Sequence, residues 1–155
     1  NDDKPILFTI KELLNRVSIL MKHELKNSLV NLNIKYEIDS SITLLGNINS
    51  LVQVINNLIS NAIQAYNGKE NQNIDLVVHK ENNNIIISIT DYGMGIPKEV
   101  QEKLFNQMIT TKGKNGTGLG LFMSYSTIKG HFKGDMTFKS EVGKGTTFNI
   151  ILPQN

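Results

Sequence analysis

Apolar and polar residues alternate along this chain with two different periods. Apolar residues recur every three or four positions in two long segments, 11–26 and 49–66, and this spacing predicts amphipathic helices. Shorter helices are expected over 98–105 and 118–129. Strict alternation, or a short apolar run between turn residues, predicts strands at 7–10, 32–38, 42–45, 74–80, 85–90, 136–139 and 146–152.

The order of these elements indicates the fold class. Short polar segments at 81–84 and 141–145 join neighbouring strands and predict two β-hairpins. No repeat, linker or low-complexity tail interrupts the 155 residues, and this length suits a single domain over 1–155. The expected fold is therefore α+β, with helices packed on one face of a mostly antiparallel sheet.

The composition argues against several kinds of protein. The chain has no cysteine, so disulfides and thiolate metal sites are excluded, and a reducing cytoplasm is permitted. Sixteen basic and fourteen acidic residues leave a net charge of +2, which gives no reason to expect a nucleic-acid partner. No apolar run approaches the roughly 20 residues of a membrane span. Because the chain starts at Asn1 with neither Met nor a signal peptide, we expect a piece of a longer protein.

The long helix expected at 49–66 carries an unusual polar face. Opposite its apolar stripe lie four uncharged amides, Gln53, Asn57, Asn61 and Gln64. A surface helix more often carries Lys and Glu there, and an amide oxygen is a suitable neutral ligand for Mg²⁺ bound to phosphates. The alternative is a solvated face in an asparagine-rich protein.

Two glycine-containing motifs follow. Asp91 comes directly after the strand expected at 85–90 and begins a D-x-G-x-G sequence with Gly93 and Gly95. A carboxylate there can accept a hydrogen bond from an exocyclic amine, and two glycines let the backbone approach a flat ring. Taken alone, however, the motif also fits an ordinary turn.

The second glycine motif opens a predicted helix. It reads Gly116-Thr117-Gly118-Leu119-Gly120-Leu121. Free backbone N–H groups and the helix dipole favour phosphate at such a position. The sequence is neither a Walker loop nor a dinucleotide fingerprint, and a flexible loop is the alternative. Since Arg16 is the single arginine, any cationic side chain on phosphate would be a lysine.

In this order, and followed by Gly-Lys-Gly-Thr-Thr-Phe at 143–148, the motifs closely resemble the GHKL superfamily, which includes gyrase, heat-shock chaperones and histidine kinases. The resemblance extends from about Phe8 to Pro153. It implies the Bergerat fold, a two-layer α/β sandwich with about three helices on a mixed sheet. It also implies that the chain binds ATP with Mg²⁺.

The resemblance assigns roles to individual residues. Residues 51–62 resemble the N box, whose last asparagine, Asn61, would hold Mg²⁺, and Asp91 would bind the adenine amino group with Thr146 nearby. Residues 104–112 resemble the F box of a mobile ATP lid. The nucleotide contacts that it implies are Asn57, Asn61, Asp91, Gly93, Gly95, Ile96, Lys112, Lys114, Gly116, Thr117, Gly118, Leu119, Gly120, Leu121 and Thr146.

Position 57 indicates the class within the superfamily. Hydrolytic members carry a glutamate one helical turn before the Mg²⁺ asparagine, whereas this chain has Asn57. An amide cannot accept a proton near neutral pH, so water would not be activated. With Asn57 and Asn61 as its catalytic residues, the site suits a histidine kinase. Two departures concern the lid and the phosphates: Met108 replaces the usual Phe of the F box, and Gln64 stands where Lys is frequent.

His23 and Glu24 resemble the phosphoacceptor motif of such kinases. Two strands are already expected between His23 and Asn61, which leaves no room for the second helix of a dimerisation hairpin. We therefore assign His23 to the first helix of the domain itself.

The resemblance further implies the setting of the domain. Its acceptor would be a histidine on an upstream dimerisation domain, through which the full protein forms a homodimer. A response-regulator receiver domain would take the phosphate next, in the cytoplasm, whether or not the full protein is membrane-anchored. Three alternatives remain: an ATP-hydrolysing GHKL domain, a non-catalytic nucleotide-binding module and a serine-directed GHKL kinase.

Overall fold

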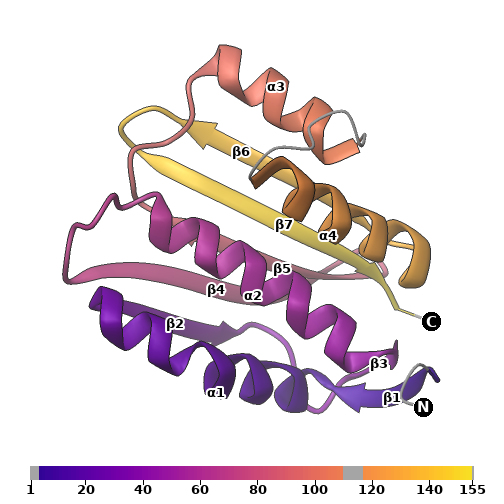
Figure 1. Cartoon of the computed structure of the whole chain (residues 1–155). Coiled ribbons are helices and arrows are strands. Elements are labelled where there is room, and N and C mark those ends of the chain that lie inside the picture. The colour runs from indigo at the N-terminus through magenta and orange to yellow at the C-terminus, as the bar shows by residue number, and fades with distance from the viewer. Residues whose placement is uncertain (1–3, 110–116, 155) are drawn as a thin grey trace.

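A mixed five-stranded sheet forms one layer of the molecule (Figure 1). The computed structural model describes residues 4–109 and 117–154. The sheet has the order β2-β4-β5-β7-β6, in which only β2 and β4 are parallel neighbours. Its strands are β2 (Val30–Tyr36), β4 (Gln72–Glu81), β5 (Asn84–Asp91), β6 (Asp135–Glu141) and β7 (Gly145–Pro153). The prediction of a mixed, mostly antiparallel sheet is confirmed.

Helices form the second layer. They are α1 (Ile10–Ser28), α2 (Ile48–Gln64), α3 (Lys98–Ile109) and α4 (Thr117–His131). The first two and α4 cover one face of the sheet, and α3 packs against α4 (Figure 1). A separate antiparallel pair, β1 (Ile6–Thr9) and β3 (Thr43–Gly46), lies at the start of α1 and α2. The expected sandwich is confirmed, with α3 as a fourth helix outside the three that lie on the sheet.

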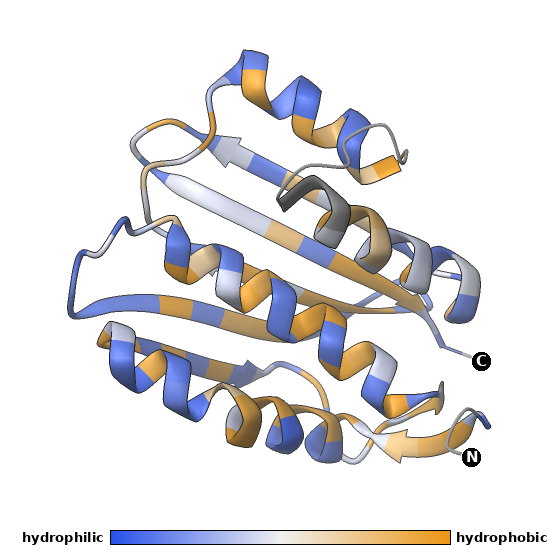
Figure 2. Ribbon diagram, in the orientation of Figure 1, coloured by the Kyte–Doolittle hydropathy of each residue, from blue (hydrophilic) through white to orange (hydrophobic). Residues whose placement is uncertain are grey.

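The core lies between the two layers because each element is apolar on one side. Ile85, Ile87 and Ile89 of β5 are buried on the side of the sheet that faces the helices. Leu51 and Ile55 of α2 are buried in the same core. Burying each such side chain contributes about 1.5–3 kcal/mol. Figure 2 shows apolar and polar residues alternating along both layers.

The far face of the sheet is lined mainly by polar side chains that bond to one another across strands. Ser88 Oγ donates to Asn149 Oδ1 at 2.7 Å, and the hydroxyls of Thr90 and Thr147 are 2.8 Å apart. Helices of the described residues cover only the opposite face.

The ends of the two long helices are set by local capping. The hydroxyl of Thr9 accepts from the N–H of Glu12, whose carboxylate accepts from the N–H of Thr9, so α1 begins earlier than the predicted Lys11. Asn47 caps α2 by accepting from the N–H of Ser50 at 3.1 Å. Capping therefore fixes the start of the helix that carries the amide stripe.

His23 lies within α1, as expected from the spacing. Its ring contacts Asn27 Nδ2 at 3.0 Å on an exposed surface. The helix ends at Ser28, its C-cap Leu29 has a left-handed φ of 53°, and β2 follows at Val30. Because α1 packs against α2, the helix that carries His23 is a structural part of this domain.

Candidate functional site

A cavity of about 280 Å³ opens between the C-terminal half of α2, the end of β5 and α3. Most of the residues around it are apolar, as is usual for pockets that hold a flat organic ring. Its lining consists of Asn61, Ala62, Gln64, Ala65, Asp91, Met94, Gly95, Ile96, Val100, Leu104, Leu121, Thr146 and Phe148. Six residues predicted from the sequence thus meet around one hollow: Asn61, Asp91, Gly95, Ile96, Leu121 and Thr146.

Asp91 is the polar centre of this cavity. It is the last residue of β5, lies opposite Thr146 of β7, and is only 5% exposed. Burial raises the pKa of its carboxyl group, while hydrogen bonds from the N–H groups of Gly93 and Thr146 oppose that rise. No cationic side chain belongs to the described lining. A carboxylate in such surroundings suits a neutral hydrogen-bond donor, such as an aromatic amine, better than a phosphate.

A hydroxyl pair supports the floor of the cavity. The Ser140 and Thr146 hydroxyl oxygens are 2.7 Å apart, and Ser140 Oγ accepts from the N–H of Ile96 at 2.8 Å. Ser140 thereby ties the loop after β5 to β6. Sequence reasoning missed Ser140, although it shares the inward-facing side of β6 with Met136 and Phe138.

Close packing against protein backbone requires both glycines of the D-x-G-x-G motif, a reason that the sequence did not indicate. A Cβ at Gly93 would lie 2.5 Å from the carbonyl oxygen of Ala65, and one at Gly95 would lie 2.1 Å from that of Glu141. Gly95 also has a φ of +73°, which favours glycine. They let the loop pack against protein backbone, and Gly93 is not in the cavity lining. That they also let the backbone approach a flat ring stays a prediction, and Gly95 does line the cavity.

Tyr66 fixes the same loop from the other side. Its hydroxyl accepts from the N–H of Tyr92 at 2.8 Å and donates to the carbonyl oxygen of Asn73. This buried tyrosine follows α2, one residue beyond the apolar stripe, and sequence reasoning gave it no role. The sequence also did not predict the apolar residues that line the cavity, such as Phe148 and Leu104. Their positions follow the ordinary apolar periodicity of a strand and a helix, which does not distinguish lining residues from core residues.

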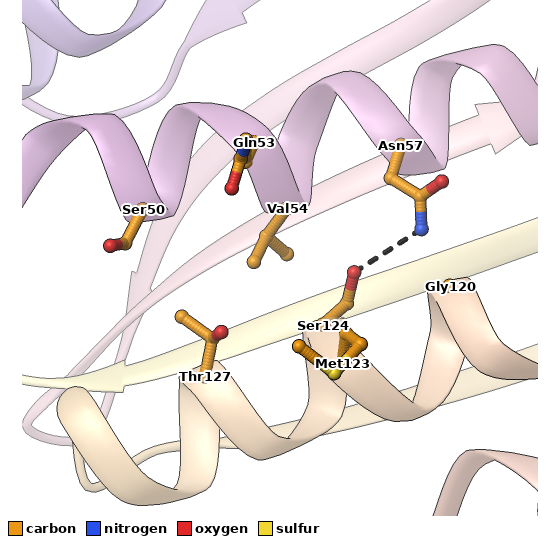
Figure 3. Close-up of a pocket in the computed structure, with 8 residues that line it drawn as sticks. All are labelled: Ser50, Gln53, Val54, Asn57, Gly120, Met123, Ser124 and Thr127. Atoms are coloured by element: carbon orange, nitrogen blue, oxygen red, sulfur yellow. Dashed lines mark hydrogen bonds between the residues drawn. The ribbon is translucent and has the colours of Figure 1, made fainter.

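A second hollow, a groove of about 310 Å³, runs between α2 and α4 (Figure 3). It is lined by Ser50, Gln53, Val54, Asn57, Gly120, Met123, Ser124 and Thr127. Gln53 and Asn57 face this groove, while Asn61 and Gln64, one and two turns further along α2, line the cavity. The prediction that the four amides share one face is confirmed, with Asn57 in the groove and not in the cavity with Asp91.

The second glycine motif opens α4, as predicted. Thr117, Gly118 and Leu119 form the first turn of that helix. A Cβ at Gly120 would lie 3.2 Å from Asn57 Nδ2, so the motif lies directly beside the amide stripe. Lys112, Lys114 and Gly116 fall outside the described residues.

The sequence profile of a family described as histidine kinase-, DNA gyrase B-, and HSP90-like ATPase matches residues 46–155. The chain belongs to this family. The members of this ATPase family bind ATP, and in this member the matched region contains the cavity and the groove.

Individual relatives of this ATPase-family chain are kinases. It is 32% identical over 145 residues to sporulation kinase A of Bacillus subtilis (strain 168), an alignment that covers 94% of this chain and 23% of the relative. The chain therefore spans about a quarter of the length of that relative. Among solved structures, the catalytic domain of histidine kinase ThkA in a nucleotide-free form gives a TM-score of 0.80 at 25% identity, covering 97% of this chain and 96% of that one.

A further structure contains a partner. Histidine kinase ThkA in complex with the response regulator protein TrrA matches with a TM-score of 0.78 at 22% identity, over 97% of this chain and 42% of that one.

Within residues 4–109 and 117–154 of the present chain, no helix is both long and apolar enough to cross a membrane.

Proposed function

We propose that this chain is the ATP-binding catalytic domain of a sensor histidine kinase, part of a two-component system. It binds ATP with Mg²⁺ and transfers the γ-phosphoryl group to a histidine on an upstream dimerisation domain of the same protein. The observation that carries the proposal is the buried Asp91, in a cavity whose described lining holds no other charged side chain. From this cavity the amide face of α2 leads to the first turn of α4.

Adenine would occupy the cavity. Its exocyclic amine would donate to Asp91, whose carboxylate has no cationic partner in the described lining, and Thr146 would lie beside the ring. The triphosphate would extend toward α4, where the N–H groups of Thr117, Gly118 and Leu119 and the helix dipole favour negative charge. Gly116, which lies outside the described residues, would contribute to the same contact. Lys112 and Lys114 would supply the cationic side chains.

Asn61 fits the role of a magnesium ligand. The described residues contain no group of three or more carboxylates and histidines that could hold a metal ion by themselves. A single amide oxygen therefore suits an ion that brings its own waters and phosphate oxygens, as Mg²⁺ does. When bound, the ion would neutralise charge on the phosphates.

Asn57 favours transfer to a histidine over hydrolysis. It stands in the groove beside Gly120, where hydrolytic relatives need a proton acceptor, and an amide does not take a proton. In the transfer, the lone pair of one imidazole nitrogen forms the bond to γ-phosphorus. The bond to the bridging oxygen breaks and ADP leaves with that electron pair, while the imidazole releases its N–H proton to solvent.

The setting follows from the relatives. Onward transfer to a response-regulator receiver domain is supported by the ThkA–TrrA complex. The homodimer through the dimerisation domain is proposed from the family resemblance alone. The domain would work in the cytoplasm, and no observation on the described surface favours a nucleic-acid partner.

The proposal is tested by giving the chain Mg·ATP with and without the dimerisation domain of its own protein. The chain alone should bind nucleotide, hydrolyse it only very slowly and acquire no acid-labile phosphate. Adding the dimerisation domain should produce phosphohistidine on that domain, slowly, because the two parts are no longer tethered.

Two of the alternatives, and an acceptor within α1, would give different results in this experiment. Brisk hydrolysis that is abolished in Asn57→Ala would favour an ATP-hydrolysing domain. Binding without transfer to the supplied histidine would favour a non-catalytic module, and phosphate on His23 would mean that α1 carries the acceptor.

A further inference from the structure

Ser124 makes the direct contact between α4 and the side chain of Asn57. Asn57 Nδ2 donates to Ser124 Oγ at 3.2 Å, across 67 positions of the sequence. Ser124 lies on the buried side of α4 and is only 5% exposed. A buried hydroxyl is costly without a partner, so this hydrogen bond also satisfies Ser124 itself.

In the structure, this bond leaves the carbonyl end of the Asn57 amide available. An amide has a donor end and an acceptor end, and Ser124 occupies the donor end. Figure 3 shows the NH₂ group turned toward Ser124 and the carbonyl oxygen turned away from it. Gly120 lies close to both ends, because a Cβ there would be 3.2 Å from Nδ2 and 3.4 Å from Oδ1. The amide is thus confined by a hydrogen bond on one side and by helix backbone on another.

We infer that Ser124 is a positioning residue for phosphoryl transfer, because it holds Asn57 with its carbonyl oxygen free as a hydrogen-bond acceptor in the groove between α2 and α4. This inference rests on the proposed function. Without Ser124, the amide can rotate by half a turn and present its NH₂ group instead. An NH₂ group there would bind a phosphate oxygen but would not accept from an imidazole N–H or from a water.

The same groove offers no competing side chain for the donor end of Asn57. Its other polar residues, Ser50 and Gln53, lie on α2 itself, and Thr127 lies a turn beyond Ser124 on α4. No hydrogen bond joins any of them to Asn57 among the described residues. Among the described residues, Ser124 is therefore the side chain that holds the amide in the observed orientation.

The first measurement is made on the 155-residue chain by nuclear magnetic resonance. The Asn57 side-chain N–H that bonds to Ser124 should shift upfield in Ser124→Ala, as expected when a hydrogen bond is lost. Ser126→Ala is the matched control, since it removes a hydroxyl from the same helix at a position that lines neither hollow. An Asn57 resonance that is unchanged in Ser124→Ala would overturn the inference.

The second measurement is phosphotransfer by the full-length protein. Losing one hydrogen bond that acts through Asn57 should lower kcat in Ser124→Ala about three- to tenfold, with KM for ATP changed less than about twofold. Ser126→Ala should leave both values unchanged. In an Asn57→Ala background, adding Ser124→Ala should have no further effect, because the group that it positions is gone.

The outcomes separate this inference from the proposed function. A wild-type protein that transfers no phosphate would overturn both. A wild-type protein that transfers normally overturns only the inference if Ser124→Ala keeps full kcat, or if its loss persists undiminished in the Asn57→Ala background. A rise in KM with unchanged kcat would mean that Ser124 supports nucleotide binding and not transfer.

Discussion

The adenine end and the phosphate end of the proposed site are built differently. At the adenine end, the loop after β5 is held by backbone: Gly93 and Gly95 lie against the carbonyl groups of Ala65 and Glu141, and the N–H of Gly143 donates to Met94 at 2.9 Å. At the phosphate end, a side-chain hydrogen bond from Asn57 of α2 to Ser124 joins the two helices, and Gly120 of α4 lies beside the same amide. In the proposed site, recognition of the base would thus depend on backbone packing, whereas the reacting end would depend on side chains.

The largest effect should come from Gly95→Ala. A Cβ at that position combines a positive φ with a 2.1 Å approach to a backbone oxygen, which cannot move like the end of a side chain. We expect a loss of about 3–5 kcal/mol in the free energy of unfolding, measured by urea denaturation.

Two matched glycine variants complete this test. Gly143→Ala has a similar φ of +83° but no neighbour within 4 Å, so it should cost about 1–2 kcal/mol. Gly120→Ala gains helix propensity and meets only a side chain, so its stability should change by less than about 1 kcal/mol. Equal losses at Gly95 and Gly120 would remove the distinction between the two ends.

Replacing Asp91 with Ala should weaken ATP binding about tenfold to a hundredfold, because a hydrogen bond to a charged group is worth roughly 1.5–3 kcal/mol. Calorimetric titration measures this loss. A nucleotide without the amino group should be affected far less. Asp75→Asn serves as the control, since Asp75 bonds to the Tyr92 hydroxyl and lies outside the cavity lining. Unchanged ATP affinity in Asp91→Ala would refute the adenine assignment.

Asn61→Ala should reduce ATP affinity by about three- to tenfold when Mg²⁺ is present and much less when it is absent. The reason is that the lost group is a metal ligand and does not contact the base. Titrations with the metal and with a chelator separate these cases. A loss of the same size under both conditions would mean that Asn61 acts through helix packing.

The smallest effect concerns pH. Burial raises the pKa of Asp91 in the folded chain, so its contribution to stability is fully present below the unfolded pKa and is lost as pH rises through the folded pKa. Asp91→Asn removes this titration. The free energy of unfolding of this variant, relative to that of the wild type, should therefore increase as the pH rises above about 4, the ordinary pKa of an aspartate. Urea denaturation across this range checks the sign, and a difference that is constant with pH would contradict it.

Much of the site could be predicted from the sequence because its signals are local. The amide stripe of α2 follows from a period of 3.6 residues, and the opening of α4 follows from a glycine motif before a helical pattern. Asp91 was found because it ends a strand and begins a D-x-G-x-G motif. Each signal lies within a few consecutive residues, where backbone geometry alone decides which side chains share a face.

Tertiary structure decided what depends on distant partners. The extension of α3 to Ile109 accompanies the complete burial of Met108, a position that the sequence marked only as a departure from the family pattern. The strand order β2-β4-β5-β7-β6 and the reason for Gly93 and Gly95 depend equally on chain segments far apart in sequence.

The hydrogen bond between Asn57 and Ser124 is the clearest case. Both residues were visible in the sequence, but nothing local relates a serine of α4 to an asparagine 67 positions earlier. Periodicity determined which residues face inward, because it depends on neighbours in the chain. Only packing of α2 against α4 brought the donor and the acceptor within 3.2 Å, since hydrogen bonds of this kind are set by distance and direction in space.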